Sequence, residues 1–213
     1  MELIADHISK TIRGKKILSD ISLSLSSGRI YGFSGRNGSG KTMLFRALSG
    51  LMSVTSGTVS WGGKILKKDF SALPGLGILL ENVSLYPELT GFQNLSYLAG
   101  IRKKIGREEI RAALLRVGLD PKDPRLYGKY SLGMKQRLAI AQAVMEQPDV
   151  LMLDEPTNSL DDQGVEEIRK LILEEKQRGA LVLLASHNRE DIRILADQLY
   201  KIEDGRIAEE VKP

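Results

Sequence analysis

The segment GRNGSGKT, residues 35–42, has the residue types of a phosphate-binding loop. Its glycines let the backbone curl so that several N–H groups point inward at phosphate oxygens. The N-terminus of the helix expected behind the loop adds unpaired N–H donors and a partial positive charge. Lys41 is a point charge for the β- and γ-phosphates, and the Thr42 hydroxyl is placed to ligate Mg²⁺. The predicted nucleotide-binding residues are Gly35, Arg36, Asn37, Gly38, Ser39, Gly40, Lys41, Thr42 and Met43.

Two carboxylates, Asp154 and Glu155, follow directly after the apolar segment 150–153. A buried strand stops where charge begins, so both residues are expected at the carboxyl edge of a sheet, where open α/β sheets bind ligands. Asp154 is predicted to hold Mg²⁺, and Glu155 to polarise the attacking water as general base. Solvated carboxylates at a strand end are the alternative, but that alternative leaves the nearby phosphate loop unexplained.

His187 ends another apolar segment, 181–186. A lone histidine is more often structural than catalytic. Its place at the end of a neighbouring strand nevertheless predicts a hydrogen-bond donor to the region of the γ-phosphate. His7 has no such context and is interpreted as structural.

The elements that must position these residues alternate between strands and helices along most of the chain. Apolar strands that alternate with helices predict an α/β fold with a mostly parallel sheet, covered on both faces. Strands are expected over 3–8, 21–25, 29–33, 76–80, 150–153, 180–185 and 199–202, with a hairpin over 58–66. Helices are expected over 43–48, 162–176 and 189–196, and helical signals dominate 90–117.

The length and composition are typical of one globular domain, or of one domain with an inserted lobe. Apolar residues make up 42% and charged residues 27% of the 213 positions. The sequence has no cysteine, which excludes disulfides and thiolate metal sites. A net charge of +4 favours anionic partners such as nucleotides or lipid headgroups, but is too small to indicate DNA. No segment approaches the roughly 18 consecutive apolar residues of a membrane helix, and the N-terminus does not resemble a signal peptide.

Taken together, the motifs resemble those of the ATP-binding subunit of an ABC transporter, over nearly the whole length. GRNGSGKT is similar to the Walker A loop, and residues 150–156 to the Walker B strand. The segment 158–161, with Asp161, resembles the D-loop, and Ser186-His187 resembles the switch histidine. Residues 130–137, YSLGMKQR, stand where the family signature belongs. Several motifs in the right order are far more specific than any one of them.

This resemblance implies the ABC ATPase fold for residues 1–213: a P-loop NTPase core, an antiparallel β subdomain and an inserted α-helical subdomain. The core and the β subdomain are expected over 1–80 and 134–213, and the helical subdomain over 81–133. The resemblance also implies ATP and Mg²⁺ as cofactors, with Glu155, His187 and Lys41 as catalytic residues.

The partners that the resemblance implies are a second ATPase subunit, identical or different, and a separate transmembrane permease. The two ATPase subunits would pair head to tail, so that Ser131, Leu132, Gly133 and Met134 of one cover the γ-phosphate held by the other. No nucleic acid is expected, and the implied location is the cytoplasmic face of a bacterial membrane. The usual signature is Leu-Ser-Gly-Gly-Gln; Tyr130, Leu132 and Met134 replace three of its five residues. Ser131 and Gly133 are expected to precede a helix that runs through 139–144, so that a hydroxyl and free backbone N–H groups meet the phosphate.

Two further departures concern ligand contacts. Glu81 stands where the family places a glutamine, and a carboxylate there is expected to serve Mg²⁺ together with Thr42 and Asp154. This glutamate and the YSLGMKQR form of the signature together resemble those of the ATPase subunits of bacitracin- and lantibiotic-type exporters. The resemblance favours export of a peptide or drug. Ile12 takes the place of the aromatic ring that usually contacts adenine, which reduces stacking.

Two other functions stay open at this point. One is a non-transport ABC ATPase that acts on nucleic acid or the ribosome, although such proteins usually carry a second cassette, a coiled coil or zinc-binding insertions. The other is a nucleotide kinase or a simple P-loop switch, which leaves residues 130–137 unexplained.

Overall fold

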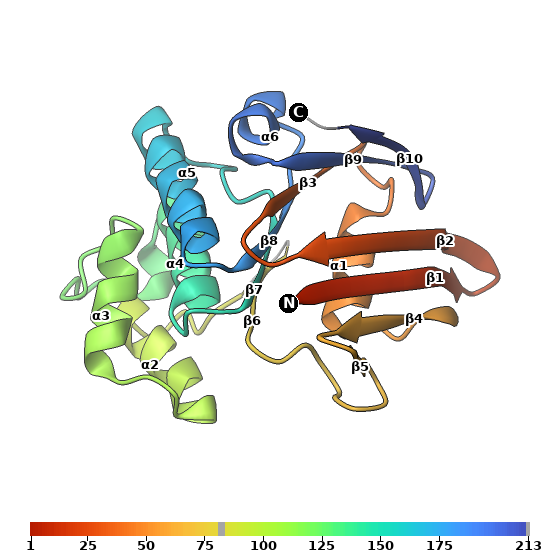
Figure 1. Ribbon diagram of the computed structural model, residues 1–213. Helices are drawn as coiled ribbons and strands as arrows, with labels where there is room; N and C mark the ends of the chain where they lie inside the picture. Colours follow the sequence, from red (N-terminus) through yellow and green to blue (C-terminus); the bar gives the residue numbers. More distant parts are fainter. Residues whose placement is uncertain (81–83, 212–213) are drawn as a thin grey trace.

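A computed structural model describes residues 1–80 and 84–211 (Figure 1). Its larger sheet has six strands in the order β10-β9-β3-β8-β7-β6. All neighbouring strands pair in parallel except β10, which lies antiparallel to β9 at one edge. The strands are β3 (Ile30–Ser34), β6 (Leu76–Leu79), β7 (Val150–Asp154), β8 (Leu181–Ala185), β9 (Gln198–Glu203) and β10 (Arg206–Val211). The mostly parallel sheet is as predicted.

The central strands β7 and β8 are buried along their whole length. Their side chains alternate between the two faces of the sheet: Leu151 and Leu153 pack on one side, Val150 and Met152 on the other. Because both faces are covered, the strands are apolar throughout instead of alternating between apolar and polar residues. Charge begins only where β7 reaches the carboxyl edge of the sheet.

A second, antiparallel sheet covers one face, together with α1 (Lys41–Ser49). In this sheet the apolar residues Ile21, Leu23 and Leu25 are buried, and the serines between them are exposed. That pattern of period two is what a sheet with one wet face requires. The strand order is β2-β1-β4-β5, formed by β1 (Glu2–Ile12), β2 (Lys15–Ser26), β4 (Ser56–Trp61) and β5 (Lys64–Ile65).

The remaining helices pack on the opposite face in one continuous apolar cluster. In Figure 1, α2 and α3 lie farthest from the antiparallel sheet. The helix α4 contacts both α3 and β6, so it joins the outlying helices to the large sheet. These elements are α2 (Gly91–Arg102), α3 (Arg107–Arg116), the short 3₁₀ helix η1 (Tyr127–Lys129), α4 (Leu132–Val144), α5 (Asp162–Gln177) and α6 (Arg189–Leu195). The division of the chain at residues 81 and 134 stays a prediction.

The turn between β9 and β10 touches two segments that lie far away in the sequence. The Gly205 N–H donates to the carbonyl of Ser39 in the glycine loop, and the Ser19 N–H of β2 donates to the Gly205 carbonyl, both at 2.8 Å. Gly205 has φ 72°, and a Cβ there would lie 2.1 Å from the carbonyl oxygen of Ile17. Only glycine fits at this crossing.

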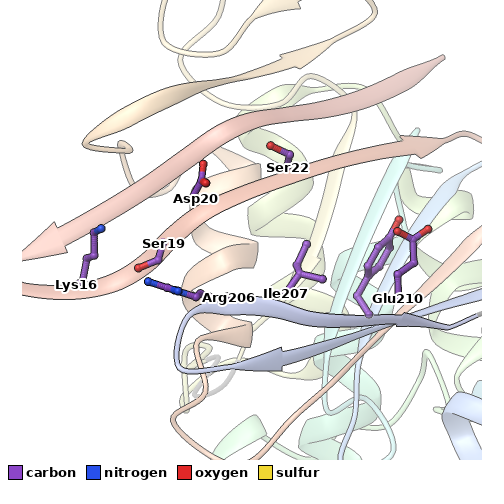
Figure 2. A pocket seen from close by; sticks show the side chains of 8 residues that line it. Lys16, Ser19, Asp20, Ser22, Arg206, Ile207 and Glu210 are labelled. Atoms are coloured by element: carbon purple, nitrogen blue, oxygen red, sulfur yellow. The ribbon is translucent and has the colours of Figure 1, made fainter.

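Beside this turn, a cleft of about 500 Å³ separates β2 from the hairpin of β9 and β10 (Figure 2). None of the predicted nucleotide-binding residues lines it. The lining residues are Lys16, Ser19, Asp20, Ser22, Tyr200, Arg206, Ile207 and Glu210. Among the helices in the described ranges, none is both long and apolar enough to cross a membrane.

Candidate nucleotide-binding and catalytic site

The glycine loop connects β3 to α1, as predicted. Gly38 and Gly40 have φ values of 79° and 112°, a region that residues with a Cβ rarely adopt. Gly40 is also the N-cap of α1, and among the described residues no side-chain hydrogen bond caps this end of the helix. The first N–H groups of α1 are therefore oriented towards the loop without a side-chain acceptor, which is the arrangement that binds phosphate.

The ammonium group of Lys41 lies within the loop. Lys41 is only 7% exposed, and its Nζ donates to the carbonyl oxygens of Gly35 at 2.8 Å and Arg36 at 3.3 Å. Neutral carbonyl groups satisfy its donors without neutralising its charge. An anionic phosphate offers stronger, charge-assisted hydrogen bonds, so the loop can exchange its own carbonyls for a ligand.

Thr42 and Asp154 bring two hard oxygen ligands together from α1 and β7. The Thr42 hydroxyl donates to Asp154 Oδ2 at 2.5 Å, and Asp154 is 4% exposed. A hydroxyl and a carboxylate are ligands that Mg²⁺ accepts, and Mg²⁺ in nucleotide sites usually has few protein ligands besides phosphates and water. The pair therefore fits the predicted metal role.

Glu155 lies beside Asp154 at the carboxyl edge, with its carboxylate held by the end of β8. The backbone N–H of His187 donates to Oε1 at 2.9 Å, and the imidazole Nδ1 lies 2.8 Å from Oε2. The hydroxyl of Ser186 lies 3.5 Å from Oε2. An ionised carboxylate only accepts, so the imidazole proton is assigned to Nδ1 in this contact. Glu155 is thus fixed in direction while it remains able to accept a proton.

In this structure His187 contacts Glu155, and its contact with the γ-phosphate region stays a prediction. The side chain of His187 is 62% exposed, so part of the ring faces solvent. The other histidine, His7, contacts Asp20 at 2.7 Å on the antiparallel sheet. This hydrogen bond and the charge of Asp20 raise the pKa of His7, and that contact fits the structural interpretation.

The signature residues lie at the start of α4, where the prediction needs a correction. Ser131 and Gly133 were expected to precede the helix, but α4 begins at Leu132, so Gly133 lies in its first turn. Ser131 is the N-cap, and its oxygen accepts from the Met134 N–H at 3.2 Å. The hydroxyl proton can still be donated to a phosphate, and Leu132 is 68% exposed.

Asp161, the predicted D-loop residue, caps α5 by accepting from the Gly164 N–H at 3.0 Å. It also lies 3.7 Å from Arg137 of α4. Within the described ranges, no hydrogen bond or ion pair joins residues 131–134 to the glycine loop of the same chain. The predicted metal ligand Glu81 lies outside the described residues.

Several contacts behind the site were not predicted. Gln136 of α4 donates to the carbonyls of Glu155 and Pro156, both at 3.0 Å. Thr157 donates to the buried Asp191 at 2.5 Å. Gln136 lies inside the signature segment, but its partners lie 19 and 20 positions away, so only the tertiary fold brings them together.

Two charged groups anchor this region. The hydrogen bond from Arg137 holds the pKa of Glu167 below its usual value, with help from Gln163. Although burial opposes its charge, the hydrogen bonds that Arg169 donates to Asp191 and Glu166 raise its pKa above the ordinary value. The two ion pairs thereby tie α5 to its neighbours, with Arg137 reaching from α4 to Glu167 and Arg169 reaching from α5 to Asp191 of α6.

Comparison with known proteins gives the family. The family model described as "ABC transporter" matches residues 18–158. The uncharacterised ABC transporter ATP-binding protein YybJ of Bacillus subtilis is 44% identical over 201 residues, which cover 94% of this chain and 92% of YybJ. The bacitracin transport ATP-binding protein BcrA of Enterococcus faecalis is 36% identical, over 97% of this chain and 68% of BcrA. The lantibiotic transport ATP-binding protein SrtF of Streptococcus pyogenes is 33% identical, over 94% of this chain and 86% of SrtF.

The fold is shared with a solved dimeric bacterial ABC transporter cassette, MJ0796. The TM-score is 0.88 at 23% identity, and the match covers 99% of this chain and 98% of MJ0796. This likeness confirms the predicted α/β architecture with its antiparallel sheet and helices. By its sequence matches, the chain belongs to the ABC transporter family, as an ATP-binding and ATP-hydrolysing subunit.

Proposed function

We propose that this subunit holds MgATP on its glycine loop and that a second ATPase subunit, oriented head to tail, closes over the nucleotide. Two features support this pairing. The uncapped N-terminus of α1 and Lys41 offer groups for the phosphates of one ATP. Ser131 and Leu132 at the start of α4 are exposed, and among the described contacts neither has a polar contact with that loop, which suits a second ATP held by another chain.

In the proposed reaction, Glu155 accepts a proton from water as the water oxygen attacks the γ-phosphorus. The bond from the γ-phosphorus to the bridging oxygen breaks, and ADP and phosphate leave. The observation that carries this proposal is the double contact of the Glu155 carboxylate with His187, at 2.9 and 2.8 Å. Lys41 and the N–H groups of the loop compensate the negative charge on the transferred group.

Thr42 and Asp154 are the residues that would hold Mg²⁺. The bound ion supplies neutralisation of the charge on the β- and γ-phosphate oxygens. The proposed third ligand is Glu81, on the basis of its place in the sequence.

The substitution Glu155→Gln tests the general base directly. We expect turnover to fall by roughly two to three orders of magnitude, because the amide cannot accept the proton. ATP affinity should stay within about threefold, since the shape and most hydrogen bonds remain. Glu203→Gln is the matched control, because it neutralises a carboxylate that pairs only with Lys201 among the described contacts. Wild-type turnover in Glu155→Gln would overturn the assignment.

We further propose that the subunit works at the cytoplasmic face of a bacterial membrane, beside a separate permease, and drives export. The relatives named for bacitracin and lantibiotic transport support a peptide-like cargo. A contact surface is available on the outlying helices. The rings of Tyr86 and Tyr97 lie edge to face with centroids 5.1 Å apart, next to Ile101 on α2. These three side chains are 44%, 55% and 71% exposed.

The partner surface can be tested by co-purification with the permease. Tyr97→Ser together with Ile101→Ser should reduce recovery of the complex at least about tenfold, because large side chains contribute roughly 1.5 kcal/mol or more each when buried. The isolated double variant should keep its ATP affinity. Leu51→Ser is the control, since Leu51 is 59% exposed but follows α1 instead of lying on α2. Full recovery of the complex would place the interface elsewhere.

A further inference from the structure

The backbone of Glu155 is held in a conformation that residues with a side chain rarely adopt. Its φ is 52°, in the left-handed region. Such residues persist only where the surrounding contacts hold them, and they concentrate at functional sites. Two contacts act directly on this residue: its N–H donates to the Ala185 carbonyl at 2.8 Å, and its carbonyl accepts from Gln136 at 3.0 Å.

A third contact acts on the tight turn that Glu155 begins. The Asn158 N–H donates back to the Glu155 carbonyl at 3.3 Å, which closes the turn. Thr157 lies inside it and is 8% exposed. Its hydroxyl donates to Asp191 Oδ2 at 2.5 Å, so a side chain of α6 holds the turn from outside.

Asp191 is itself rigidly held. It is fully buried, and its other oxygen, Oδ1, accepts from Arg169 Nε at 2.8 Å and Nη2 at 2.6 Å. Arg169 also contacts Glu166 at 2.6 Å and Glu190 at 3.3 Å. A buried carboxylate with one oxygen bound to a guanidinium and the other to a hydroxyl has little freedom to rotate.

Asp191 also stands in the first turn of α6, four residues after His187. The covalent path from His187 to Asp191 and the contacts with Thr157 and Glu155 therefore form a closed ring. One side of the ring is the contact between the Glu155 carboxylate and His187. The other side is the hydrogen bond between Asp191 and Thr157.

We propose that Asp191, acting through Thr157, is a positioning residue that fixes the turn at Glu155 relative to His187. It thereby sets the direction in which the Glu155 carboxylate meets the attacking water. This inference rests on the general-base role proposed above for Glu155. Asp191 and Thr157 touch neither ATP nor water in the reaction; their effect passes through the backbone.

Thr157→Val is the sharpest variant, because it keeps the side-chain shape and leaves the pair of Arg169 and Asp191 intact. We expect kcat for ATP hydrolysis by the full chain to fall roughly 10- to 100-fold, the size of one lost hydrogen bond to a charged group. The KM for ATP should stay within about twofold, because the glycine loop is unchanged. Thr157→Ser restores the hydroxyl and should recover kcat to within about twofold of the wild type.

Glu175→Gln is the matched control for lost buried charge. Glu175 is 1% exposed and pairs with Arg178 at 2.7 Å and Arg116 at 2.8 Å, near the other end of α5. Asp191→Asn and Glu175→Gln should both lower the thermal unfolding temperature, but only Asp191→Asn should lower kcat. Equal kcat values in these two variants would indicate a merely structural role and overturn the proposal.

NMR provides a readout that does not depend on turnover. The chain has only two histidines, so the imidazole resonances of His7 and His187 can be assigned by substitution. Thr157→Val should shift the His187 resonances and leave those of His7 in place. Unmoved His187 resonances, or wild-type kcat in Thr157→Val while Glu155→Gln is inactive, overturn the positioning role alone. Wild-type turnover in Glu155→Gln overturns the general base itself.

Discussion

The glycine loop (35–42) and the signature turn (131–134) are both predicted to bind phosphate, but they are built in opposite ways. In the loop, Lys41 is 7% exposed and already bonded to the carbonyls of Gly35 and Arg36. In the signature turn, Ser131 is exposed and Leu132 is 68% exposed. The loop is therefore ordered by its own chain, whereas the signature turn presents its groups outward.

This difference shows which interactions one chain can complete. A loop whose cation is held in place loses little conformational entropy when a nucleotide arrives, so its affinity should belong to the isolated subunit. An exposed helix N-terminus has no such enclosure, and water competes for its donors until another surface covers it. Nucleotide binding and nucleotide turnover should respond separately to changes in the two regions.

The largest effect is expected at the loop. Lys41→Ala removes the charge-assisted contacts with the phosphates, and we expect ATP affinity of the isolated subunit to fall roughly 100-fold. Isothermal titration calorimetry on the purified chain measures this loss. Lys68→Ala, at an exposed position outside the loop, should leave affinity unchanged. Unaltered ATP affinity in Lys41→Ala would show that the glycine loop does not determine ATP binding by the isolated subunit, and its contrast with the signature turn would be lost.

A smaller and different effect is expected at the signature turn. Ser131→Ala should leave ATP affinity of the isolated subunit within about twofold, but lower hydrolysis in the assembled transporter roughly tenfold. Thr90→Ala is the matched control, because Thr90 caps α2 in the same way, with its hydroxyl accepting from Gln93. Both changes should cost about 1 kcal/mol of helix capping. If Ser131→Ala weakens ATP binding by the isolated subunit, Ser131 contacts the ATP held by its own chain, and the contrast with the glycine loop is lost.

The smallest effect concerns the anchor that holds α4 behind the signature turn. Arg137 lowers the pKa of Glu167 from its usual 4.5, so the ionised form is favoured in the folded state. Because the folded pKa is the lower one, the stabilisation is present above about pH 5 and is lost as pH falls through the lowered value. Glu167 is 37% exposed, and screening limits the contribution to roughly 0.5 kcal/mol.

Thermal unfolding of the wild type and Glu167→Gln as a function of pH checks this value. The two unfolding temperatures should differ slightly at neutral pH and converge as the pH falls below the lowered pKa of Glu167. A difference that grows as the pH falls would contradict the sign of the shift.

The parts of the site that could be predicted from sequence are those whose chemistry is local. Residues 35–42 form a loop from consecutive residues, and Asp154 follows its strand directly, so pattern and position coincide. The start of α4 was misplaced, because a helix that opens with an exposed apolar residue, Leu132, carries a weak signal for its own beginning. A serine such as Ser131 can be recognised as an N-cap only after the residues of the following helix have been assigned.

Contacts between distant segments could not be predicted. Strand ends could be assigned to one edge of the sheet, and this placed His187 near Glu155. The side-chain contact itself depends on the register of β7 against β8, which the apolar residues of both strands leave open. Asp191 gave no signal at all, since a carboxylate in the first turn of a helix is usually a solvated capping group.

The crossing at Gly205 has a consequence for the two ends of the chain. Three stretches separated by as many as 186 positions, at Ser19, Ser39 and Gly205, share a pair of backbone hydrogen bonds. A bulky residue at Gly205 would push the hairpin of β9 and β10 off β2 and pull on the carbonyl of Ser39. The hairpin of β9 and β10 thus supports the glycine loop from behind, and a change in this hairpin would alter the loop that is predicted to hold ATP.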